Sequence, residues 1–447
     1  MIMKTYESIA IGIPDILLPK AGTDLSKWAV IACDQFTSEP EYWKKVSDIV
    51  NDEPSTLNLI YPEVYLGEKD PESRIASIRY HMNLYLQESL LEQKQGFIYV
   101  ERQTGQKIRK GLMLCIDLDQ YDFHKGSSSL VRATEGTILD RIPPRVKIRE
   151  GAPLEVPHIM VLIDDPENTV IGPLTQNKDR LERLYDIELM MDSGHLAGYR
   201  VNESEVENGI IQSLQVLAAP EAFEKKYDLS PQTPVLLFAM GDGNHSLATA
   251  KSIWEKTKEN ALDKTTILDS PLRYALVELV NLHDEALNFE PIHRALFELA
   301  SGRDVLEEMK AFYPGRSLFV PASSADEMIA AVDAQQGSPH KIGVITPSGF
   351  GVMEVSNHGS NLPVGTLQNF CDVFLEEGGA KEIDYIHGSD TIIQLGKKAS
   401  SMGFYLPTMN KHDLFKTVIL DGATPHKTFS LGEAWEKRFY MEARKLT

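Results

Sequence analysis

Apolar positions along this chain follow two spacings, one typical of amphipathic helices and one typical of buried strands. From residue 72 to about 93 the apolar side chains recur near helical spacing, which predicts a long amphipathic helix. The continuous apolar runs at 28–33 and 158–163 are typical of buried strands. Because such strands and helices interleave along the chain, we expect an α/β fold of mixed α+β type.

Further segments extend this alternation to the end of the chain. Residues 97–100 and 112–116 flank a turn at 103–106 and predict a hairpin. A short apolar strand at 235–239 runs into a helix through Lys258, and 273–280 is another strand candidate. We expect a first domain over 1–297 and an α/β C-terminal domain over 298–447. The other expected elements are helices at 43–50, 178–184, 204–217, 305–312, 325–332 and 366–376, and strands at 317–320 and 342–346.

Composition narrows the functional class. The 447 residues are 42% hydrophobic and 25% charged, as in a globular protein. Lys plus Arg total 45 and Asp plus Glu total 65, so the net charge is −20 and no nucleic-acid partner is expected. Cys33, Cys115 and Cys371 lack metal-ligand spacing and are typical of free thiols in a reducing compartment. With no apolar run long enough for a membrane span, we expect a cytoplasmic protein.

A glycine-rich turn between the 235–239 strand and its helix is the most informative segment. A strand-to-helix junction presents unpaired backbone N–H groups and the positive end of a helix dipole, which together bind phosphates. Asp242 and His245 add an acid, a base or a metal ligand. The alternative is an ordinary turn in which Asn244 or Ser246 caps the helix. The residues of this turn are Gly241, Asp242, Gly243, Asn244, His245 and Ser246.

A second candidate segment, 131–145, is rich in arginine. Arg132, Arg141 and Arg145 could make forked contacts to an anion, for which arginine is well suited. Glu135 or Asp140 could act as a base or a metal ligand. The alternative is a surface loop with ordinary ion pairs.

Histidines follow two other predicted strands. His283 and Asp284, then His293 and Arg294, come just after the 273–280 strand, where loops often carry functional residues. His387 lies near another strand end. Each histidine could equally be a hydrogen-bonded structural residue. The chain contains no Walker A motif, no G-x-G-x-x-G, no H-E-x-x-H and no G-x-S-x-G, so the corresponding enzyme classes lack support.

Taken together, four motifs resemble a prokaryotic family known as domain of unknown function ten-fifteen, and the resemblance covers nearly the whole chain. In order, the motifs are Thr134-Glu-Gly-Thr137 with Asp140-Arg141, Gly241-Asp-Gly-Asn-His245, Glu290-Pro-Ile-His-Arg294 and Asp384-Tyr-Ile-His-Gly388.

The glycine turn also resembles the Asp-Gly-x-His-Arg signature of the ParB/sulfiredoxin-like superfamily, which includes sulfiredoxin, a free-serine kinase and CTP-binding partition proteins. The resemblance implies a ParB/sulfiredoxin-like core and a phosphate-binding role for Gly241, Gly243, Asn244 and Ser246. Ser246 stands where the superfamily usually has Arg, so an arginine from 131–145 would have to supply that contact.

These observations predict a nucleotide- or phosphate-dependent enzyme acting on a small molecule, most plausibly a phosphotransferase using ATP, ADP or CTP with Mg²⁺. Glu135 is the expected base, with Asp242 and His245 beside it and Asp242 as metal ligand. Arg132 and Arg141 would bind phosphate, and His293 and Arg294 would contact the substrate. The alternatives are a nucleotide-binding regulatory module without turnover and a metal-dependent small-molecule hydrolase. The oligomeric state stays open.

Overall fold

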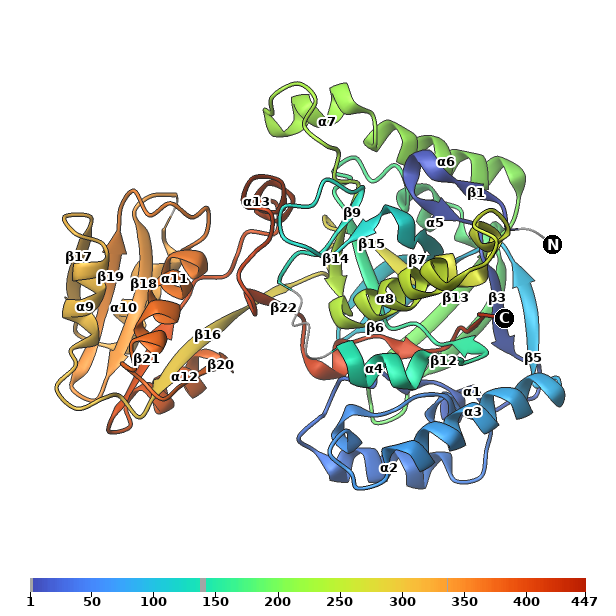
Figure 1. Cartoon of the computed structure of the whole chain (residues 1–447), viewed down its shortest axis with the longest axis horizontal. Coiled ribbons are helices and arrows are strands. Elements are labelled where there is room, and N and C mark those ends of the chain that lie inside the picture. Colours follow the sequence, from blue (N-terminus) through green and yellow to red (C-terminus); the bar gives the residue numbers. More distant parts are fainter. Residues whose placement is uncertain (1–2, 137–141, 336) are drawn as a thin grey trace. The chain divides into compact units, whose positions relative to one another are not determined.

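The computed structural model describes residues 3–136, 142–335 and 337–447, which form two compact units (Figure 1). Unit 1 comprises Met1–Leu287 and Gly432–Thr447, and unit 2 comprises Asn288–Leu431. The division differs from the one expected at 297/298, because it falls earlier and because the end of the chain returns to unit 1. Both units are mixed α/β, as predicted.

Unit 1 is built on a large mixed sheet. Most neighbouring strands are antiparallel, but β11 is parallel to β15, and β9 is parallel to both β14 and β8. The strand order is β12 (Glu182–Glu188), β13 (His195–Val201), β6 (Phe97–Thr104), β7 (Lys107–Asp117), β15 (Tyr274–Asn281), β11 (Met160–Ile163), β14 (Phe238–Asp242), β9 (Val131–Arg132) and β8 (Tyr121–Asp122), with β1 (Thr5–Tyr6) and β2 (Ile11–Gly12) joined to β7.

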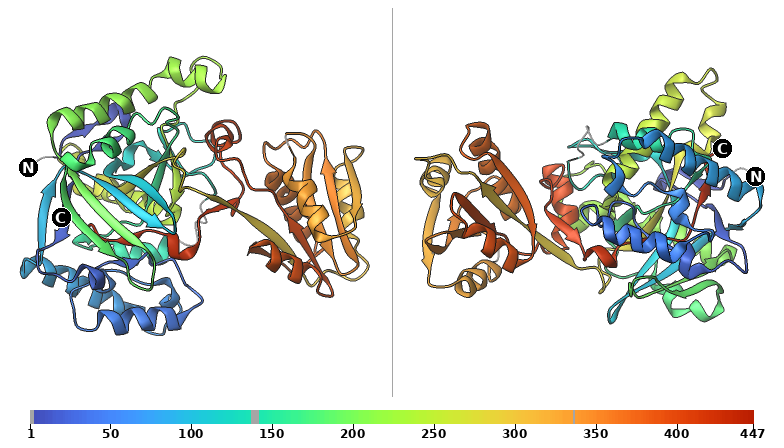
Figure 2. Two further views of the ribbon diagram at one scale, coloured as in Figure 1. Left: turned by 180° about the vertical axis from the view of Figure 1, so that it is seen from behind. Right: turned by 90° about the horizontal axis from the view of Figure 1, so that it is seen from below.

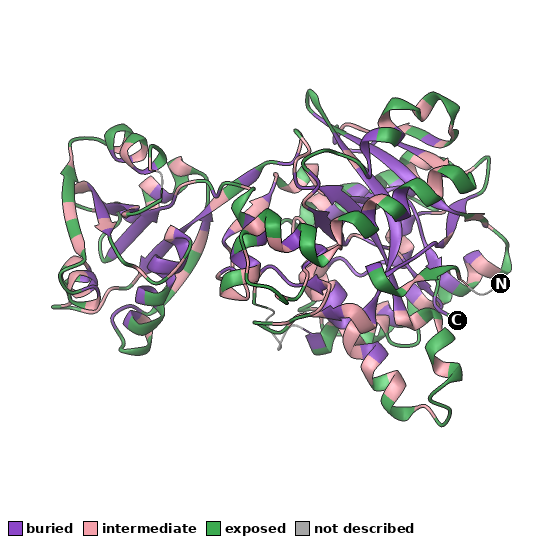
Figure 3. Ribbon diagram, turned by 90° about the horizontal axis from the view of Figure 1, so that it is seen from above, coloured by how far each residue is buried: buried purple, intermediate pink, exposed green. Residues whose placement is uncertain are grey.

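Both faces of this sheet are covered, because its central strands are buried along most of their length. Along β7, Met113 and Cys115 belong to one core and Leu112 and Leu114 to the other, as the alternation of side chains in a strand requires. Figure 3 shows the strands mostly buried and the outer helix faces exposed. Helices α2 (Pro40–Val50) and α3 (Pro71–Gln87) pack on the first core, and α6 (Ser204–Leu217) and α8 (Asn244–Asn260) pack on the second.

Short pairings tie the chain ends into unit 1, where both termini lie (Figure 2). The pairs are β4 (Val30–Ile31) with β23 (Phe439–Tyr440), β10 (Leu154–Glu155) with β24 (Arg444–Lys445), and β3 (Asp15–Pro19) with β5 (Leu91–Gln95). The remaining helices of unit 1 are α1 (Leu25–Trp28), α4 (Ile142–Arg149), α5 (Gly172–Gln176) and α7 (Pro220–Tyr227).

Unit 2 has its own sheet and its own core. The strand order is β17 (Ser317–Ala322), β19 (Gly349–Val355), β18 (His340–Thr346), β21 (Ser401–Tyr405), β16 (Phe289–Phe297) and β20 (Glu382–His387), and β22 (Phe429–Leu431) also pairs with β16. Its helices are α9 (Val305–Phe312), α10 (Ala325–Asp333), α11 (Pro363–Glu376), α12 (Ser389–Gly396) and α13 (Asp413–Asp421).

Some of the expected elements differ from the structure, and one of these is the strand expected at 235–239, which is β14 over Phe238–Asp242. The helix expected at 178–184 is wrong, since a short 3-10 turn is followed there by β12, which pairs with β13. The long helix ends at Gln87, and the next residues form β5 instead. The expected strand at 28–33 is only Val30–Ile31, because Trp28 ends α1, whose start Asp24 caps.

Candidate functional site

The predicted strand-to-helix junction is present, but the strand expected at 235–239 is β14 over Phe238–Asp242, so Gly241 and Asp242 end the strand and α8 begins at Asn244. Gly243 is the N-cap of α8 with a positive φ of 78°, and a Cβ there would lie 3.1 Å from the Cα of Ile159. Both facts require glycine at this position. No side chain caps α8, so the predicted capping by Asn244 or Ser246 is wrong. The first backbone N–H groups of α8 therefore have no intrahelical acceptor, and the positive end of its dipole lies at this point.

Asp242, the last residue of β14, forms an ion pair with a residue from the end of the chain. Its Oδ2 lies 3.0 Å from Nζ of Lys437, and its Oδ1 accepts the Gly243 N–H at 2.9 Å. Burial would raise the pKa of the Asp242 carboxyl, but Lys437, His158 and the Gly243 amide together hold that pKa below its usual value. The Lys437 side chain is only 11% exposed, so its ammonium group is held beside the first turn of α8.

Buried arginines fix the segment that carries Lys437. Arg102 of β6 and Arg109 of β7 donate to the carbonyls of Trp435 and Glu436, at 3.0 and 3.2 Å. Arg438 donates from Nε to the carbonyl of Pro157 at 3.0 Å and forms ion pairs with Glu278 and Glu442. The backbone on both sides of Lys437 is thus anchored to the sheet. Because this backbone is fixed and Asp242 holds the ammonium group, the Lys437 side chain loses little conformational entropy when it contacts an anion.

His158 lies next to the same turn, one residue before Ile159. Its Nδ1 is 2.8 Å from the Tyr440 hydroxyl, and its Nε2 is 3.9 Å from Oδ2 of Asp34. The Asp34 carboxylate is itself oriented by Gln35, whose side chain donates to Oδ1 at 2.9 Å. Three segments that are far apart in sequence therefore meet at His158.

Glu63 adds a second carboxylate beside Asp34. Its backbone N–H donates to the carbonyl of Cys33 at 2.8 Å, and its side chain pairs with Arg145. Burial raises the pKa of Glu63 above its usual value, and the negative charge of Asp34 adds to this effect, while Arg145 opposes it. We call Asp34, Glu63, His158, Asp242 and Lys437, together with the first turn of α8, the α8 site.

The first residues of the arginine-rich segment, 131–134, run along β14 toward this turn. β9 pairs with β14 in parallel, and the Thr134 hydroxyl donates to the carbonyl of Met240 at 2.9 Å. Glu135 follows directly, in the direction of the α8 turn. Arg132 is buried and donates to the carbonyls of Ser129, Pro234 and Val235, so its guanidinium group holds backbone rather than facing the turn. Arg141 and Asp140 lie outside the described residues.

The other side chains of the turn are half-buried. Asn244 Oδ1 has no hydrogen-bond partner among the residues that the structure describes. His245 is in the first turn of α8, and its backbone carbonyl accepts the Thr249 hydroxyl at 2.7 Å. Ser246 follows it in the same turn. A ligand that carries both an anion and a hydroxyl or amino donor would match this set of groups.

His293 and Arg294 belong to unit 2, where they contact its core. Arg294 is fully buried and donates to the carbonyls of Ile292, His426 and Lys427. The His293 ring stacks on Tyr405 at 4.5 Å, and its Nδ1 accepts the Leu406 N–H at 3.1 Å. Burial lowers the pKa of His293 to about 4. These contacts account for both side chains without a substrate.

His283 of unit 1 makes a close contact with Asp164, at 2.6 Å from Nε2 to Oδ1. Tyr227 also donates to this carboxylate, and Lys226 lies 2.9 Å from it. Asp164 thus joins α7 to the ends of β11 and β15. This arrangement is typical of a structural contact.

No group of three or more His, Cys, Asp or Glu side chains is arranged to hold a metal ion within residues 3–136, 142–335 and 337–447. The carboxylate of Asp242, which the sequence predicts as a Mg²⁺ ligand, contacts Lys437, and its role toward a metal stays a prediction. Among the same described residues, no helix has the length and apolar character needed to cross a membrane.

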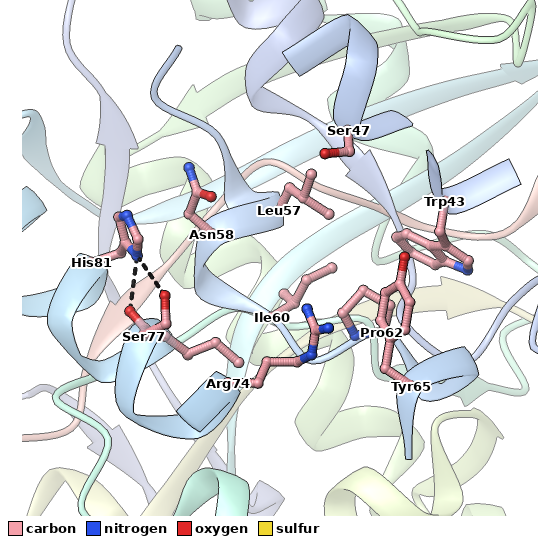
Figure 4. A pocket seen from close by; sticks show the side chains of 11 residues that line it. Trp43, Ser47, Leu57, Asn58, Ile60, Pro62, Tyr65, Arg74, Ser77 and His81 are labelled. Atoms are coloured by element: carbon pink, nitrogen blue, oxygen red, sulfur yellow. Dashed lines mark hydrogen bonds between the residues drawn. The ribbon is translucent and has the colours of Figure 1, made fainter. Parts of the chain in front are cut away.

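A separate cavity of about 180 Å³ lies in unit 1 between α2, α3 and the segment that joins them (Figure 4). Its polar groups mostly contact one another or nearby residues. His81 Nδ1 lies 2.8 Å from the carbonyl of Ser77, and Arg74 makes two hydrogen bonds to Glu68. None of the five named residues of the α8 site lines this cavity.

The mixed α/β fold and the α8 site together describe a class of protein in which a strand–turn–helix junction lies beside a half-buried lysine–aspartate pair. Residues 17–374 match the model of a family described as "Protein of unknown function (DUF1015)". The chain therefore belongs to this family, as the order of its motifs predicts. A search of the curated proteins found no match.

Some solved structures are distantly similar to this chain. Mutant forms of a free serine kinase in complex with AMP and with ADP each give a TM-score of 0.39 at 10% identity, covering 77% of this chain and 94% and 95% of theirs. A conserved hypothetical protein from Pyrococcus furiosus gives a TM-score of 0.35 at 10% identity, covering 77% of this chain and 98% of that one.

Several residues of the α8 site are not identified by sequence analysis. Lys437, Asp34 and Glu63 belong to no recognisable motif, nor does Tyr440, which contacts His158, and Lys437 is 195 positions from Asp242. His158 is the exception, since a histidine directly before a buried apolar strand marks a strand end in a mixed sheet. That position could have been recognised as a candidate.

Proposed function

We propose that this chain is a nucleotide- or phosphate-dependent enzyme that transfers a phosphoryl group to a small molecule, with its active site at the α8 site. The observation that carries the proposal is the ammonium group of Lys437, held by Asp242 beside the uncapped first turn of α8. Phosphoryl transfer depends mainly on positioning and on neutralising charge, and this pair of groups supplies both.

The phosphate-binding half consists of the first backbone N–H groups of α8, from Asn244 to Ser246, and Lys437. Amides at a helix N-terminus donate directly to phosphate oxygens, and the dipole favours the negative charge. In the superfamily that the turn resembles, the arginine of the motif supplies a positive charge to the phosphate. Here Lys437 supplies that charge. This role for Lys437 replaces the one expected for Arg132, whereas the phosphate-binding role of Arg141 stays a prediction.

The acid–base half consists of Glu135, His158, Asp34 and Glu63. During transfer, the acceptor oxygen forms a bond to phosphorus, the bond from phosphorus to the leaving oxygen breaks, and the acceptor proton passes to a base. We assign the base to Glu135, because the Thr134 contact with Met240 directs this segment toward the turn. Asp242 then holds Lys437, and His158 donates to an oxygen of the ligand.

A Mg²⁺ ion bridging the nucleotide phosphates would enter with the nucleotide, since such ions keep several waters and use few protein ligands. The proposal therefore needs no metal cage made by the protein. Carboxylates from Asp34 or Glu63 are the groups in the α8 site that could contact the ion.

The test is to incubate the full chain with ATP, ADP or CTP, with and without Mg²⁺, and to measure binding by calorimetry and nucleotide consumption by chromatography against a panel of small hydroxyl and amino compounds. Acceptor-dependent loss of the terminal phosphate supports the proposal. Binding without turnover indicates a regulatory module. Absence of binding to any nucleotide or to inorganic phosphate overturns the site.

A further inference from the structure

The Tyr440 hydroxyl connects the backbone of Cys33 to the ring of His158. It accepts the Cys33 N–H at 3.1 Å and lies 2.8 Å from His158 Nδ1. The Tyr440 side chain is 1% exposed, so water does not reach its hydroxyl. Every hydrogen-bonding group of this hydroxyl must therefore be satisfied within the protein.

The direction of the bond to His158 follows from the proton count. A tyrosine hydroxyl carries a single hydrogen. The Cys33 N–H is only a donor, so the oxygen accepts there and its hydrogen is available for another group. Imidazole Nδ1, at 2.8 Å, is the strong acceptor within reach. If Nδ1 carried the proton instead, the Nδ1–H and the Cys33 N–H would both donate to the Tyr440 oxygen. The buried hydroxyl hydrogen of Tyr440 would then have no acceptor at His158.

The competing acceptor is the sulfur of Cys33. A neutral thiol sulfur accepts hydrogen bonds only weakly, whereas an unprotonated imidazole nitrogen accepts them well. Burial raises the pKa of the Cys33 thiol, so this sulfur stays neutral. The hydroxyl hydrogen is therefore directed to Nδ1.

The opposite side of the ring agrees with this assignment. Nε2 faces the Asp34 carboxylate at 3.9 Å, which favours a proton on Nε2. That distance is too long for a hydrogen bond, and Nε2 has no closer acceptor among the described residues. The Nε2–H group can therefore donate to a ligand in the α8 site.

We propose that Tyr440 is a positioning residue, which holds the neutral His158 ring in the Nε2–H tautomer so that this N–H is offered to a ligand oxygen. The inference rests on the proposed function for the role of that N–H in phosphoryl transfer. The wrong tautomer would present a lone pair to an anion, which repels it. Groups that orient a histidine typically affect function by about tenfold to a hundredfold when removed.

The tautomer is measured directly by nitrogen-15 NMR of the full chain labelled at histidine, at a pH where the rings are neutral. The His158 signals are identified by their loss in His158→Gln. We expect a protonated nitrogen at Nε2 and an unprotonated one at Nδ1. A protonated Nδ1 in the unaltered protein would overturn the proposal, whatever the activity measurements show.

Tyr440→Phe tests the consequence. We expect mixed His158 tautomers, turnover reduced by about tenfold to a hundredfold, and nucleotide affinity within a few-fold of the original. Tyr85→Phe is the matched control, because Tyr85 is also buried in unit 1 and its hydroxyl bonds to Ser55 N–H at 3.0 Å, away from His158. The control should change neither the His158 signals nor turnover.

Two results separate this inference from the proposed function. If the unaltered protein shows no turnover but has the Nε2–H tautomer, the proposed function and the catalytic role of His158 fail together, and only the tautomer is supported. If turnover is present and Tyr440→Phe reduces neither it nor the tautomer preference, the positioning role fails and the proposed function stands. Thermal melting of both variants shows whether they are folded.

Discussion

Lys437 and Asp242 make the contact that distinguishes the α8 site from an ordinary helix start. A helix N-terminus alone attracts anions weakly, whereas an added ammonium group makes charge-assisted hydrogen bonds. In the proposed function, Asp242 fixes Lys437 rather than contacting the anion. Its lowered pKa keeps it negative, and therefore able to hold Lys437, across the neutral range.

Lys437→Met keeps the length of the side chain and removes its charge. We expect nucleotide or phosphate affinity to fall by about 1.5–3 kcal/mol, the free energy typical of a hydrogen bond to a charged group. Calorimetry measures this loss. The control is Lys256→Met, since Lys256 is exposed on α8 and pairs with Glu150. Equal affinities in the Lys437 variant and the original protein would remove Lys437 from the site.

Glu135→Gln keeps the shape of the side chain and removes its basicity. Because the loss of a general base typically costs about 10²–10⁴ in rate, turnover should fall by that factor while nucleotide affinity stays within a few-fold. Steady-state kinetics with the identified acceptor measures both. Glu259→Gln, near the far end of α8, is the control. Full turnover in the Glu135 variant would transfer the role of base to Glu63 or Asp34.

The glycine turn could be predicted from sequence because its chemistry is local. Two glycines, an acid and a histidine follow a short apolar run, and this spacing alone predicts the change from strand to helix. Lys437 could not be assigned in this way, since its partner Asp242 is 195 positions away in the sequence. The roles predicted for His245, Ser246 and Gly241 stay predictions, as does the ParB/sulfiredoxin-like relationship.

Helices with clear periodicity were the most predictable elements. Ser204–Leu217 and Val305–Phe312 have the bounds that their apolar spacing predicts. Strands on sheet edges were less predictable, as β12 shows. Its charged residues suit a helix surface, but pairing with β13 decides its conformation. The local sequence pattern therefore determines whether a segment forms a helix or a strand only where pairing with another strand does not override it.

The return of the C-terminal segment to unit 1 depends on buried charge. Arg438 is 4% exposed and contacts Glu278 and Glu442, which are each 1% exposed. Glu442 is only four positions from Arg438, but Glu278 is 160 positions away, so the local sequence does not identify Glu278 as a partner. A contiguous division at 297/298 consequently assigns this segment to the wrong unit.

Arg438→Leu tests how strongly the segment is held. Removing one member of a buried ion pair leaves uncompensated charges, so we expect unfolding of unit 1 to require about 3–5 kcal/mol less free energy. Urea titration followed by tryptophan fluorescence measures this change. Arg183→Leu is the control, because its pair with Asp186 is exposed and is worth at most about 1 kcal/mol. Similar effects for the two variants would contradict this account of the segment.

The two units differ in the groups that respond to acid. In unit 1, Asp242, Glu155 and Glu278 have pKa values held below their usual ones by arginine or lysine partners that outweigh burial. In unit 2, burial lowers the pKa of His293 to about 4 and that of His340 to about 3. The charges of these groups therefore change in different ranges of pH.

We expect unit 2 to lose stability first as the pH falls. The unfolded chain protonates its histidines near pH 6.5, while folded His293 and His340 stay neutral until much lower pH. Below pH 6.5 the unfolded state thus binds more protons, and stability falls through the window from 6.5 to about 4. At pH 5 each histidine costs about 2 kcal/mol. The lowered carboxylates of unit 1 lose their contribution only below about pH 4.

The tryptophans make this order measurable, because all four, Trp28, Trp43, Trp254 and Trp435, belong to unit 1. During acid titration, far-UV circular dichroism should begin to change before tryptophan fluorescence does, since only the former reports on unit 2. His293→Gln should shift the first change to lower pH. His124→Gln, at an exposed position in unit 1, should leave it in place. Coincident transitions in the unaltered protein would show that the two units do not unfold in this order.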